Sequence, residues 1–461
     1  MTLRVLAAAV TLLLLPTMLL AQESDAERRL RVQGKQFEEE IIQVAEGVFT
    51  SVGTTVSNVS MIVGDDGVII IDTGMTTDAA EKILVEFRKI TDKPVKAIIF
   101  THGHGDHTGG AVAFVGDAKP QIWARANFGS EERPLTAAGL TIQRQRGVRQ
   151  AGFALPASQR INNGVAPAQR PERGGRAFES GKQVVPTHTF DEPRKAIEVA
   201  GVKLELVAAP GETEDELYVW YPAKKVLFAG DNFYRSFPNL YAIRGTPYRD
   251  VKAWADSLDK MVNEGPSVLV GGHTRPVLDE KEVHEFLVSY RDAVRFVHDK
   301  TVEGMNKGLT PDQLVEYVKL PDHLADKPYL GEFYGNVEWS VRSVFNGYLG
   351  WFDGNPTNLF RLSQKEEAGR MAELAGGADN LLKRAKQAFE SGDPQWACQL
   401  ADHLIALDHE AIAAKGLKAD ALTKLGENCV TATGRNYYLT VAQELRNSLQ
   451  PVPNPGNQKA K

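Results

Sequence analysis

Cysteine is nearly absent from this chain of 461 residues, which contains only Cys398 and Cys429. The two are too far apart in the sequence to form the CxxC spacing that redox motifs and many zinc sites use. They could pair in an oxidising compartment, but a disulfide needs Cα atoms within ~7 Å, and the sequence alone does not place them that close. A disulfide between them is therefore left open.

An excess of positive charge is also absent. The chain has 53 Lys and Arg against 59 Asp and Glu, for a net charge of −6. It therefore offers no broad basic surface of the kind that neutralises phosphates, and we expect no nucleic-acid partner. With 43% hydrophobic and 24% charged residues, the composition is that of a soluble globular protein of two or three domains.

Long hydrophobic runs are scarce, and the most informative one lies at the N-terminus. Arg4 precedes an apolar core at 5–15, followed by Pro16 and a short tail that ends at Ala21. This core is too short for a membrane span of ~20 residues, so residues 1–21 are predicted to be a secretory signal peptide. We expect a secreted or periplasmic protein with no stable membrane anchor after cleavage. An uncleaved anchor is the alternative, because Leu19 is larger than cleavage sites usually prefer.

Strand and helix patterns alternate through the first half of the chain. A helix is expected at 78–90, and 157–180 is expected to be a long loop over the site. Short β-branched runs bounded by Gly and Asp predict strands at 60–63, 67–74, 95–100, 121–124, 196–209 (a hairpin turning at 200–201), 217–221, 226–230 and 267–271.

The densest group of reactive side chains directly follows the strand expected at 95–100. Three histidines and an aspartate fall within six positions there: His102, His104, Asp106 and His107. So many imidazoles beside a carboxylate are useful when a cation binds them. The two that are two positions apart can face one metal, while the adjacent aspartate and histidine can reach a second. A polar surface loop is the alternative.

Three further candidate ligands lie where other strands are expected to end, namely Asp231, His273 and Glu212. A carboxylate between two cations can bridge them, and this role suits Asp231. His273 would complete the ligand set of the second ion, and Glu212 that of the first. Three neighbouring acids could replace Glu212: Glu214, Asp215 and Glu216. Asp72, at the end of the preceding strand, is a candidate to orient the imidazoles.

Over residues 40–280 these motifs resemble the metallo-β-lactamase superfamily, whose signature is His-x-His-x-Asp-His. The resemblance implies an α/β fold, the αβ/βα sandwich, with two Zn²⁺ ions per chain. Glu212 stands where most of the superfamily has histidine, which resembles the linear alkyl sulfatases. Asp231 is the aspartate of the wider superfamily, where alkyl sulfatases typically have glutamate. The segment 239–250 resembles the one that contacts the sulfate group, which implies substrate-binding roles for Arg244 and Asn239.

The expected function is a zinc-dependent hydrolase that cleaves a small-molecule alkyl sulfate ester to alcohol and sulfate. Two close cations lower the pKa of a water and so supply hydroxide at neutral pH. Asp106, Asp231 and Arg244 are the predicted catalytic residues. The alternatives are a hydrolase of another ester, a lactone, a β-lactam or a phosphodiester, and a non-catalytic partner-binding protein with a structural metal. Histidine and carboxylate ligands do not by themselves separate zinc from manganese or iron.

Helical spacing dominates after Pro276, which predicts an all-α region following the sandwich. The expected domains are a catalytic domain at 22–282, a helical dimerisation domain at 283–449 and a disordered tail at 450–461. The run at 330–356 resembles the dimerisation domain of alkyl sulfatases, which implies a homodimer. Four short helices at 381–449 resemble a tetratricopeptide-like array. The C-terminal sterol-carrier-like domain common in that family is not expected.

Overall fold

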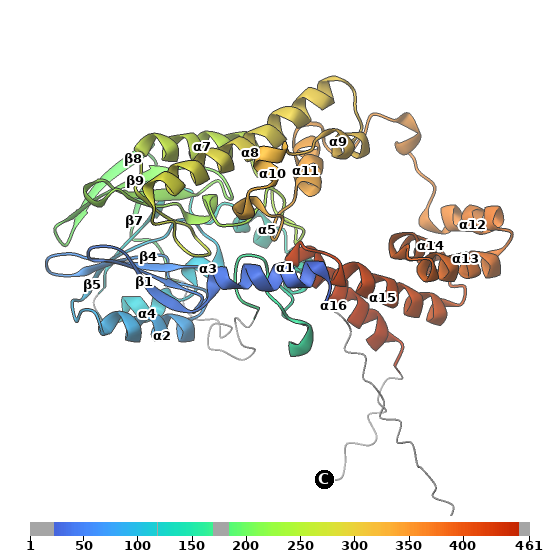
Figure 1. The fold of residues 1–461 in the computed structure, drawn as a ribbon, viewed down its shortest axis with the longest axis horizontal. Coiled ribbons are helices and arrows are strands. Elements are labelled where there is room, and N and C mark those ends of the chain that lie inside the picture. Colours follow the sequence, from blue (N-terminus) through green and yellow to red (C-terminus); the bar gives the residue numbers. More distant parts are fainter. Residues whose placement is uncertain (1–22, 118, 169–183, 451–461) are drawn as a thin grey trace, which may run out of the picture.

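The fold comes from a computed structural model that describes residues 23–117, 119–168 and 184–450 (Figure 1). The predicted signal peptide lies outside these residues, as do residues 169–180 of the predicted long loop and 451–461 of the predicted tail. Two β-sheets packed face to face form the first part of the chain, and helices form the rest.

The first sheet has seven strands in the order β1-β2-β3-β4-β5-β6-β7. Pairing is antiparallel from β1 to β4 and parallel from β4 to β7. The predicted strands at 60–63, 67–74, 95–100 and 121–124 are confirmed, whereas β1, β2 and β7 were not predicted. The strands are β1 Glu40–Ala45, β2 Val48–Val52, β3 Val59–Val63, β4 Val68–Ile71, β5 Val95–Ile99, β6 Gln121–Arg125 and β7 His188–Phe190.

The second sheet has five strands in the order β12-β11-β10-β9-β8. The predicted hairpin is confirmed, and it turns where Ala200 and Gly201 both have positive φ angles, 52° and 75°. The predicted strands at 226–230 and 267–271 are present but shorter, because the chain turns off toward the site. The strands are β8 Arg194–Val199, β9 Val202–Ala208, β10 Leu217–Tyr221, β11 Val226–Phe228 and β12 Val268–Val270.

Helices cover the outer face of each sheet, which gives the four layers of an αβ/βα sandwich (Figure 1). Strand β4 shows why. Ile69 and Ile71 point into the core between the sheets, while Val68 and Ile70 point into the core under helices α2 and α4. Successive strand residues face opposite sides, so a strand covered on both faces is apolar throughout. The covering helices are α2 Thr77–Arg88 and α4 Ala111–Val115 on one side, and α7 Val251–Glu264 and α8 Glu280–Asn306 on the other.

The all-α region predicted after the sandwich is confirmed, including the four helices expected at 381–449. The domain boundary predicted at residue 282 falls inside α8 and stays a prediction. No helix among the described residues is both long and apolar enough to cross a bilayer. The remaining helices are α1 Asp25–Gln33, α3 Gly105–Thr108, α5 Glu132–Ala137, α6 Ile142–Ala151, α9 Pro311–Tyr317, α10 Asp322–Ala325, α11 Val337–Leu349, α12 Gln364–Ala375, α13 Ala378–Glu390, α14 Pro394–Ala406, α15 Ala411–Glu427 and α16 Ala432–Ser448.

The last helix, α16, returns from the helical array to the sandwich and packs against α6. The buried amide of Asn436 donates to the backbone carbonyls of Gln150 and Asn162, at 3.3 and 3.2 Å. Arg435, also buried, donates to the carbonyl of Gln159 at 2.8 Å. The bond to Gln150 holds the end of α6 in place, and the other two hold the chain that follows it. Helix α6 forms part of the site described below.

Both cysteines are free thiols in this structure. Burial raises the pKa of Cys398 to about 11, so roughly one molecule in a thousand carries the thiolate at pH 8. We therefore expect the folded protein to react slowly with a thiol reagent at pH 8, and two thiols to react once guanidinium unfolds it. A single reactive thiol, or none, after unfolding without a reductant would show that a disulfide or another modification is present.

Candidate metal centre

The loop after β5 carries the histidine motif into the space between the two sheets. Asp72, just after β4, holds this loop, because it accepts from the backbone N–H of Thr101 at 2.9 Å and from its hydroxyl at 2.8 Å. His102 and His107 are fully buried as a result. Adjacent parallel strands thus place the motif and its anchor at the same edge of the sheet.

A first group of side chains that could hold one ion consists of His102, His104, Glu212 and Asp231. Their candidate ligand atoms all lie within 4.8 Å of one another. His102 Nε2 is 2.9 Å from His104 Nδ1, and His104 Nδ1 is 3.5 Å from Glu212 Oε2. Asp231 Oδ2 lies 3.9 Å from His102 Nε2. Glu214, Asp215 and Glu216 do not belong to this group.

A second group consists of Asp106, His107 and His273, again with ligand atoms within 4.8 Å. Asp231 also reaches this group, since Oδ1 is 3.2 Å from both His107 Nε2 and His273 Nε2, and Oδ2 is likewise 3.2 Å from His273 Nε2. Asp106 Oδ2 lies 3.8 and 3.7 Å from the same two nitrogens. The seven predicted ligands therefore meet in one place, with Asp231 between the two groups.

Two glycines shape the turns around Asp231. Gly230 has a φ angle of +57°, which L side chains rarely adopt, and a Cβ there would lie 2.4 Å from Glu216 Oε1. A Cβ at Gly272 would lie 2.0 Å from Asp231 Oδ1. Any other residue at Gly272 would displace the central carboxylate. The position of the Asp231 side chain therefore depends on a glycine at 272.

Hydrogen bonds on the far side of the rings fix how three histidines face the centre. His107 Nδ1 lies 2.7 Å from Asp72 Oδ2, and His273 Nδ1 lies 2.8 Å from the carbonyl of Val56. His102 Nδ1 lies 3.0 Å from the hydroxyl of Thr101. In each ring Nε2 is left to face the centre, as metal-binding histidines require. The predicted contact of Asp72 is confirmed for one imidazole, that of His107, and the positive φ angle of Asp72, 55°, marks local strain at this position.

The donor set fits divalent cations. His107 Nε2 and Asp231 Oδ1 are buried. Although they lie 3.2 Å apart, neither atom makes a hydrogen bond within the described part of the chain. This is costly for polar atoms unless something else satisfies them. Four imidazoles and three carboxylates suit zinc and other first-row metals. The arrangement can therefore hold two ions, with Asp106 as the partly exposed member.

In the absence of bound metal, the close packing of these ionisable groups shifts the pKa values of all four histidines. Burial lowers the pKa of His107, but the charges of Asp231 and Asp72 outweigh it and raise that pKa well above its usual value. His104 behaves in the same way because of Glu131, and His273 because of Asp231. Burial lowers the pKa of His102 well below its usual value.

Arg244 lies beside the first group, and its predicted contact with substrate stays a prediction. Its Nη2 is 3.2 Å from His104 Nε2 and 3.2 Å from Glu131 Oε1. Helix α6 holds its backbone, because the side chain of Gln150 accepts from the Arg244 N–H at 2.9 Å and Arg146 donates to the carbonyl of Ile243 at 2.6 Å. The sequence pattern between residues 125 and 194 was too weak to predict α6.

Asn239 is buried, and its side-chain nitrogen is without a hydrogen-bond partner among the described residues. Its carbonyl accepts from Arg249 Nη1 at 2.7 Å. Because this places its backbone, rather than its side chain, next to a site residue, its predicted contact with substrate stays a prediction.

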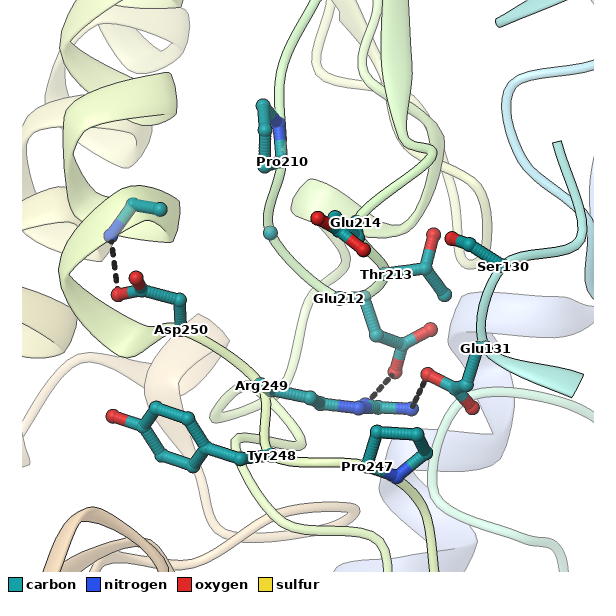
Figure 2. A pocket seen from close by; sticks show the side chains of 12 residues that line it. Ser130, Glu131, Pro210, Glu212, Thr213, Glu214, Pro247, Tyr248, Arg249 and Asp250 are labelled. Atoms are coloured by element: carbon teal, nitrogen blue, oxygen red, sulfur yellow. Dashed lines mark hydrogen bonds and ion pairs between the residues drawn. The ribbon is translucent and has the colours of Figure 1, made fainter. Parts of the chain in front are cut away.

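Two buried residues at the site were not predicted, Glu131 and Arg249. Figure 2 shows the Arg249 guanidinium between the carboxylates of Glu212 and Glu131, with Nη1 2.6 Å from Glu212 Oε1 and Nη2 3.8 Å from Glu131 Oε2. The charges of His104 and Arg249 outweigh burial and hold the pKa of Glu131 well below its usual value. Arg249 lies in the segment 239–250 singled out by resemblance, but no role was assigned to it, whereas Glu131 stands in no local motif.

A cavity of about 590 Å³ opens onto the second group and Arg244. Its wall comes from α6, from the described part of the predicted long loop and from α16, which contributes Thr433. Asp106, His273 and Arg244 are among the residues that line it. The other lining residues are mixed, with apolar Val56, Met75, Val148, Ala151, Phe153 and Val165 beside polar Gln143, Arg144, Gln150 and Asn163.

Comparison with known families agrees with this geometry. The profile described as the metallo-beta-lactamase superfamily matches residues 52–273, which include all seven candidate ligands. The profile described as alkyl sulfatase dimerisation matches residues 310–448.

Characterised relatives share most of the chain. A linear primary-alkylsulfatase from a Pseudomonas strain is 39% identical over 85% of this chain and 74% of its own length. An alkyl/aryl-sulfatase of Saccharomyces cerevisiae is 31% identical, covering 90% of this chain and 64% of its own. The solved structure of a stereoselective inverting sec-alkylsulfatase from Pseudomonas superposes with a TM-score of 0.84 at 31% identity, covering 92% of this chain and 68% of that one.

Metal binding should release protons. Because the pKa values of His104, His107 and His273 are raised above the usual 6.5, these rings bind an additional proton more readily than a free imidazole, and an incoming cation must displace it. Apparent affinity for Zn²⁺ should therefore rise as the pH rises through neutrality and fall as it drops. Calorimetric titration in two buffers of different ionisation heat measures the protons released, with a titration into buffer alone as the control. Binding without proton release would contradict the protonation assigned to these rings.

Proposed function

Because this chain belongs to the alkyl sulfatase family of the metallo-β-lactamase superfamily, we propose that it is a zinc-dependent hydrolase of alkyl sulfate esters, which it cleaves to an alcohol and sulfate. The observation that carries the proposal is the pair of ligand groups that share Asp231, open to a cavity that also contains Arg244. An imidazole-rich ligand set favours zinc.

Each ligand has a role in this proposal. His102, His104 and Glu212 would hold one ion and Asp106, His107 and His273 the other, with Asp231 between the two groups. Two bound ions would supply hydroxide at neutral pH by lowering the pKa of a water, and would polarise the ester. No serine or cysteine nucleophile is needed.

The cavity supports an amphiphilic substrate. Arg244 lines it and presents a guanidinium, which matches the geometry of an oxyanion such as sulfate through paired charged hydrogen bonds. The apolar side chains in the lining, Val56, Met75, Val148, Ala151, Phe153 and Val165, suit an alkyl chain, since burying each methylene contributes about 0.8 kcal/mol. A charged group beside the ligand groups and apolar side chains in the same cavity would together orient the ester.

Replacing Arg244 should impair sulfate release while leaving the metal sites filled. For Arg244→Ala we expect kcat/KM on an alkyl sulfate to fall roughly 100-fold to 1000-fold, because a charged donor to the sulfate is lost. Arg244→Lys should fall in between, since a point charge replaces the planar fork. The assay compares alkyl sulfates of graded chain length with a β-lactam, a lactone and a phosphodiester.

An exposed arginine on α12 provides the control, and Arg370→Ala should retain full activity. Wild-type protein that holds two metals but turns over only another ester class would refute the sulfatase assignment. Unchanged kcat/KM in Arg244→Ala would refute the role of that arginine alone.

Export to the periplasm or the medium, with cleavage after about Ala21, is also proposed. It is supported by the apolar core at 5–15 and the short tail behind it. N-terminal sequencing of the secreted protein decides whether the mature chain begins at Gln22.

A homodimer is the proposed assembly, formed through the segment 350–363 between α11 and α12. This segment lies within the match to the dimerisation profile, and it exposes large apolar side chains that water does not favour: Trp351 is 71% and Phe360 95% exposed. Single exposed apolar residues are common, but several within one segment favour a protein interface.

The dimer prediction can be tested with a charge in this segment. Phe360→Asp should convert a dimer to a monomer in sedimentation velocity, because an interface cannot bury an unpaired carboxylate without a large desolvation cost. Val85→Asp, at a site on α2 that is 60% exposed, should stay dimeric. A monomeric wild-type protein, or a dimer that survives Phe360→Asp, would contradict this interface.

A further inference from the structure

Glu131 connects the candidate metal ligands to Arg244, although nothing in the sequence marks it. It lies in the turn before α5 and is 9% exposed. Its Oε1 is 3.0 Å from His104 Nε2 and 3.2 Å from Arg244 Nη2, and its Oε2 is 3.8 Å from Arg249 Nη2. One carboxylate therefore faces a candidate ligand and two arginines.

The contact with His104 decides which ring nitrogen is available to a cation. His104 differs from the other three histidines, because its Nδ1 faces the first group. Nδ1 can bind a metal only if the ring proton is on Nε2. A carboxylate beside Nε2 accepts that proton's hydrogen bond and so favours this tautomer.

Arg244 favours the opposite tautomer of His104, the one with the proton on Nδ1. Its Nη2 is also 3.2 Å from His104 Nε2, and a guanidinium can only donate. If Arg244 donated to Nε2, the ring proton would be on Nδ1 and would face the cation. Glu131 accepts from both groups, so it keeps the arginine satisfied and the imidazole in the tautomer that binds metal.

Arg249 keeps the Glu131 carboxylate next to these partners. Its guanidinium lies between Glu131 and Glu212, as Figure 2 shows, and its Nη1 donates to Glu212 Oε1 at 2.6 Å. Glu212 Oε2 faces His104. The chain of contacts therefore runs from one candidate ligand, Glu212, through Arg249 and Glu131 to another, His104, and on to Arg244.

We propose that Glu131 is a positioning residue that holds His104 in its metal-binding tautomer and aims Arg244 into the cavity. Its effect on Arg244 rests on the proposed function, whereas its effect on His104 requires only that a metal binds. A carboxylate that only formed a structural ion pair would not need to lie beside both His104 and Arg244, whose side chains meet at His104 Nε2.

The first test is Zn²⁺ affinity, measured by competition with a chromogenic chelator. Glu131→Gln should weaken one of two sites about tenfold or more, the usual effect of removing a partner behind a metal ligand. Glu214→Gln removes an exposed carboxylate from the neighbouring cavity shown in Figure 2 and should bind Zn²⁺ as the wild type does. Folded Glu131→Gln protein with two unchanged affinities would overturn the proposal.

A rescue separates positioning from a general loss of structure. If Arg244 competes for His104 Nε2, then adding Arg244→Ala to Glu131→Gln should restore part of the Zn²⁺ affinity. Added damage instead of rescue would contradict the tautomer argument. For Glu131→Gln on an alkyl sulfate we also expect a higher KM together with a lower kcat.

A measurement on the wild type avoids variants that fail to fold. Nitrogen NMR of ¹⁵N-histidine in the Zn²⁺-loaded protein should show the proton of His104 on Nε2, and a proton on Nδ1 would overturn the proposal. Neither this nor the affinity test uses a substrate. A protein without sulfatase activity would therefore refute the proposed function while leaving the role of Glu131 to be decided separately.

Discussion

The carboxylate of Asp231 is the element on which the rest of the site depends. It is buried and lies between the two groups of candidate ligands, with Oδ1 3.2 Å from His107 Nε2 and Oδ2 3.9 Å from His102 Nε2. Gly272 leaves the space that Asp231 occupies, and β11 and β12, which pair in parallel, bring the turns at Gly230 and Gly272 together. The second sheet therefore supplies the centre, and the histidine loop of the first sheet closes around it.

Opposite charges explain how so many ionisable side chains can be buried together. Burying a single unpaired carboxylate costs several kcal/mol, and here Asp106, Glu212 and Asp231 converge with four imidazoles. Two divalent cations would neutralise three carboxylates and leave the site slightly positive, which suits an anionic substrate. Beyond the candidate ligands, positive and negative side chains still alternate: Arg249 lies between Glu212 and Glu131, and Arg244 lies beside Glu131. Each buried charge thus has an opposite charge beside it.

Much of this site could be predicted from local patterns. The motif at His102 to His107 is compact, and Asp231 and His273 follow apolar strands, so parallel strands bring them to one edge. Glu131 could not be predicted, because a single acid carries no pattern and its partner Arg244 lies 113 residues away. Arg249 lies in the segment 239–250, but its position between two carboxylates is visible only in the folded chain. Helix α6 was missed for a related reason: α16 holds it from the far end of the chain. Strand β7 likewise pairs with β6, which is distant in the sequence.

The central claim is that Asp231 lies between two bound metal ions. Anomalous diffraction at the zinc absorption edge, from crystals of protein purified without chelator, tests it directly. The account predicts two peaks about 3.5–4 Å apart, one beside His102, His104 and Glu212 and one beside Asp106, His107 and His273, with an oxygen of Asp231 against each. A single peak, or a pair in which Asp231 contacts only one ion, would contradict it.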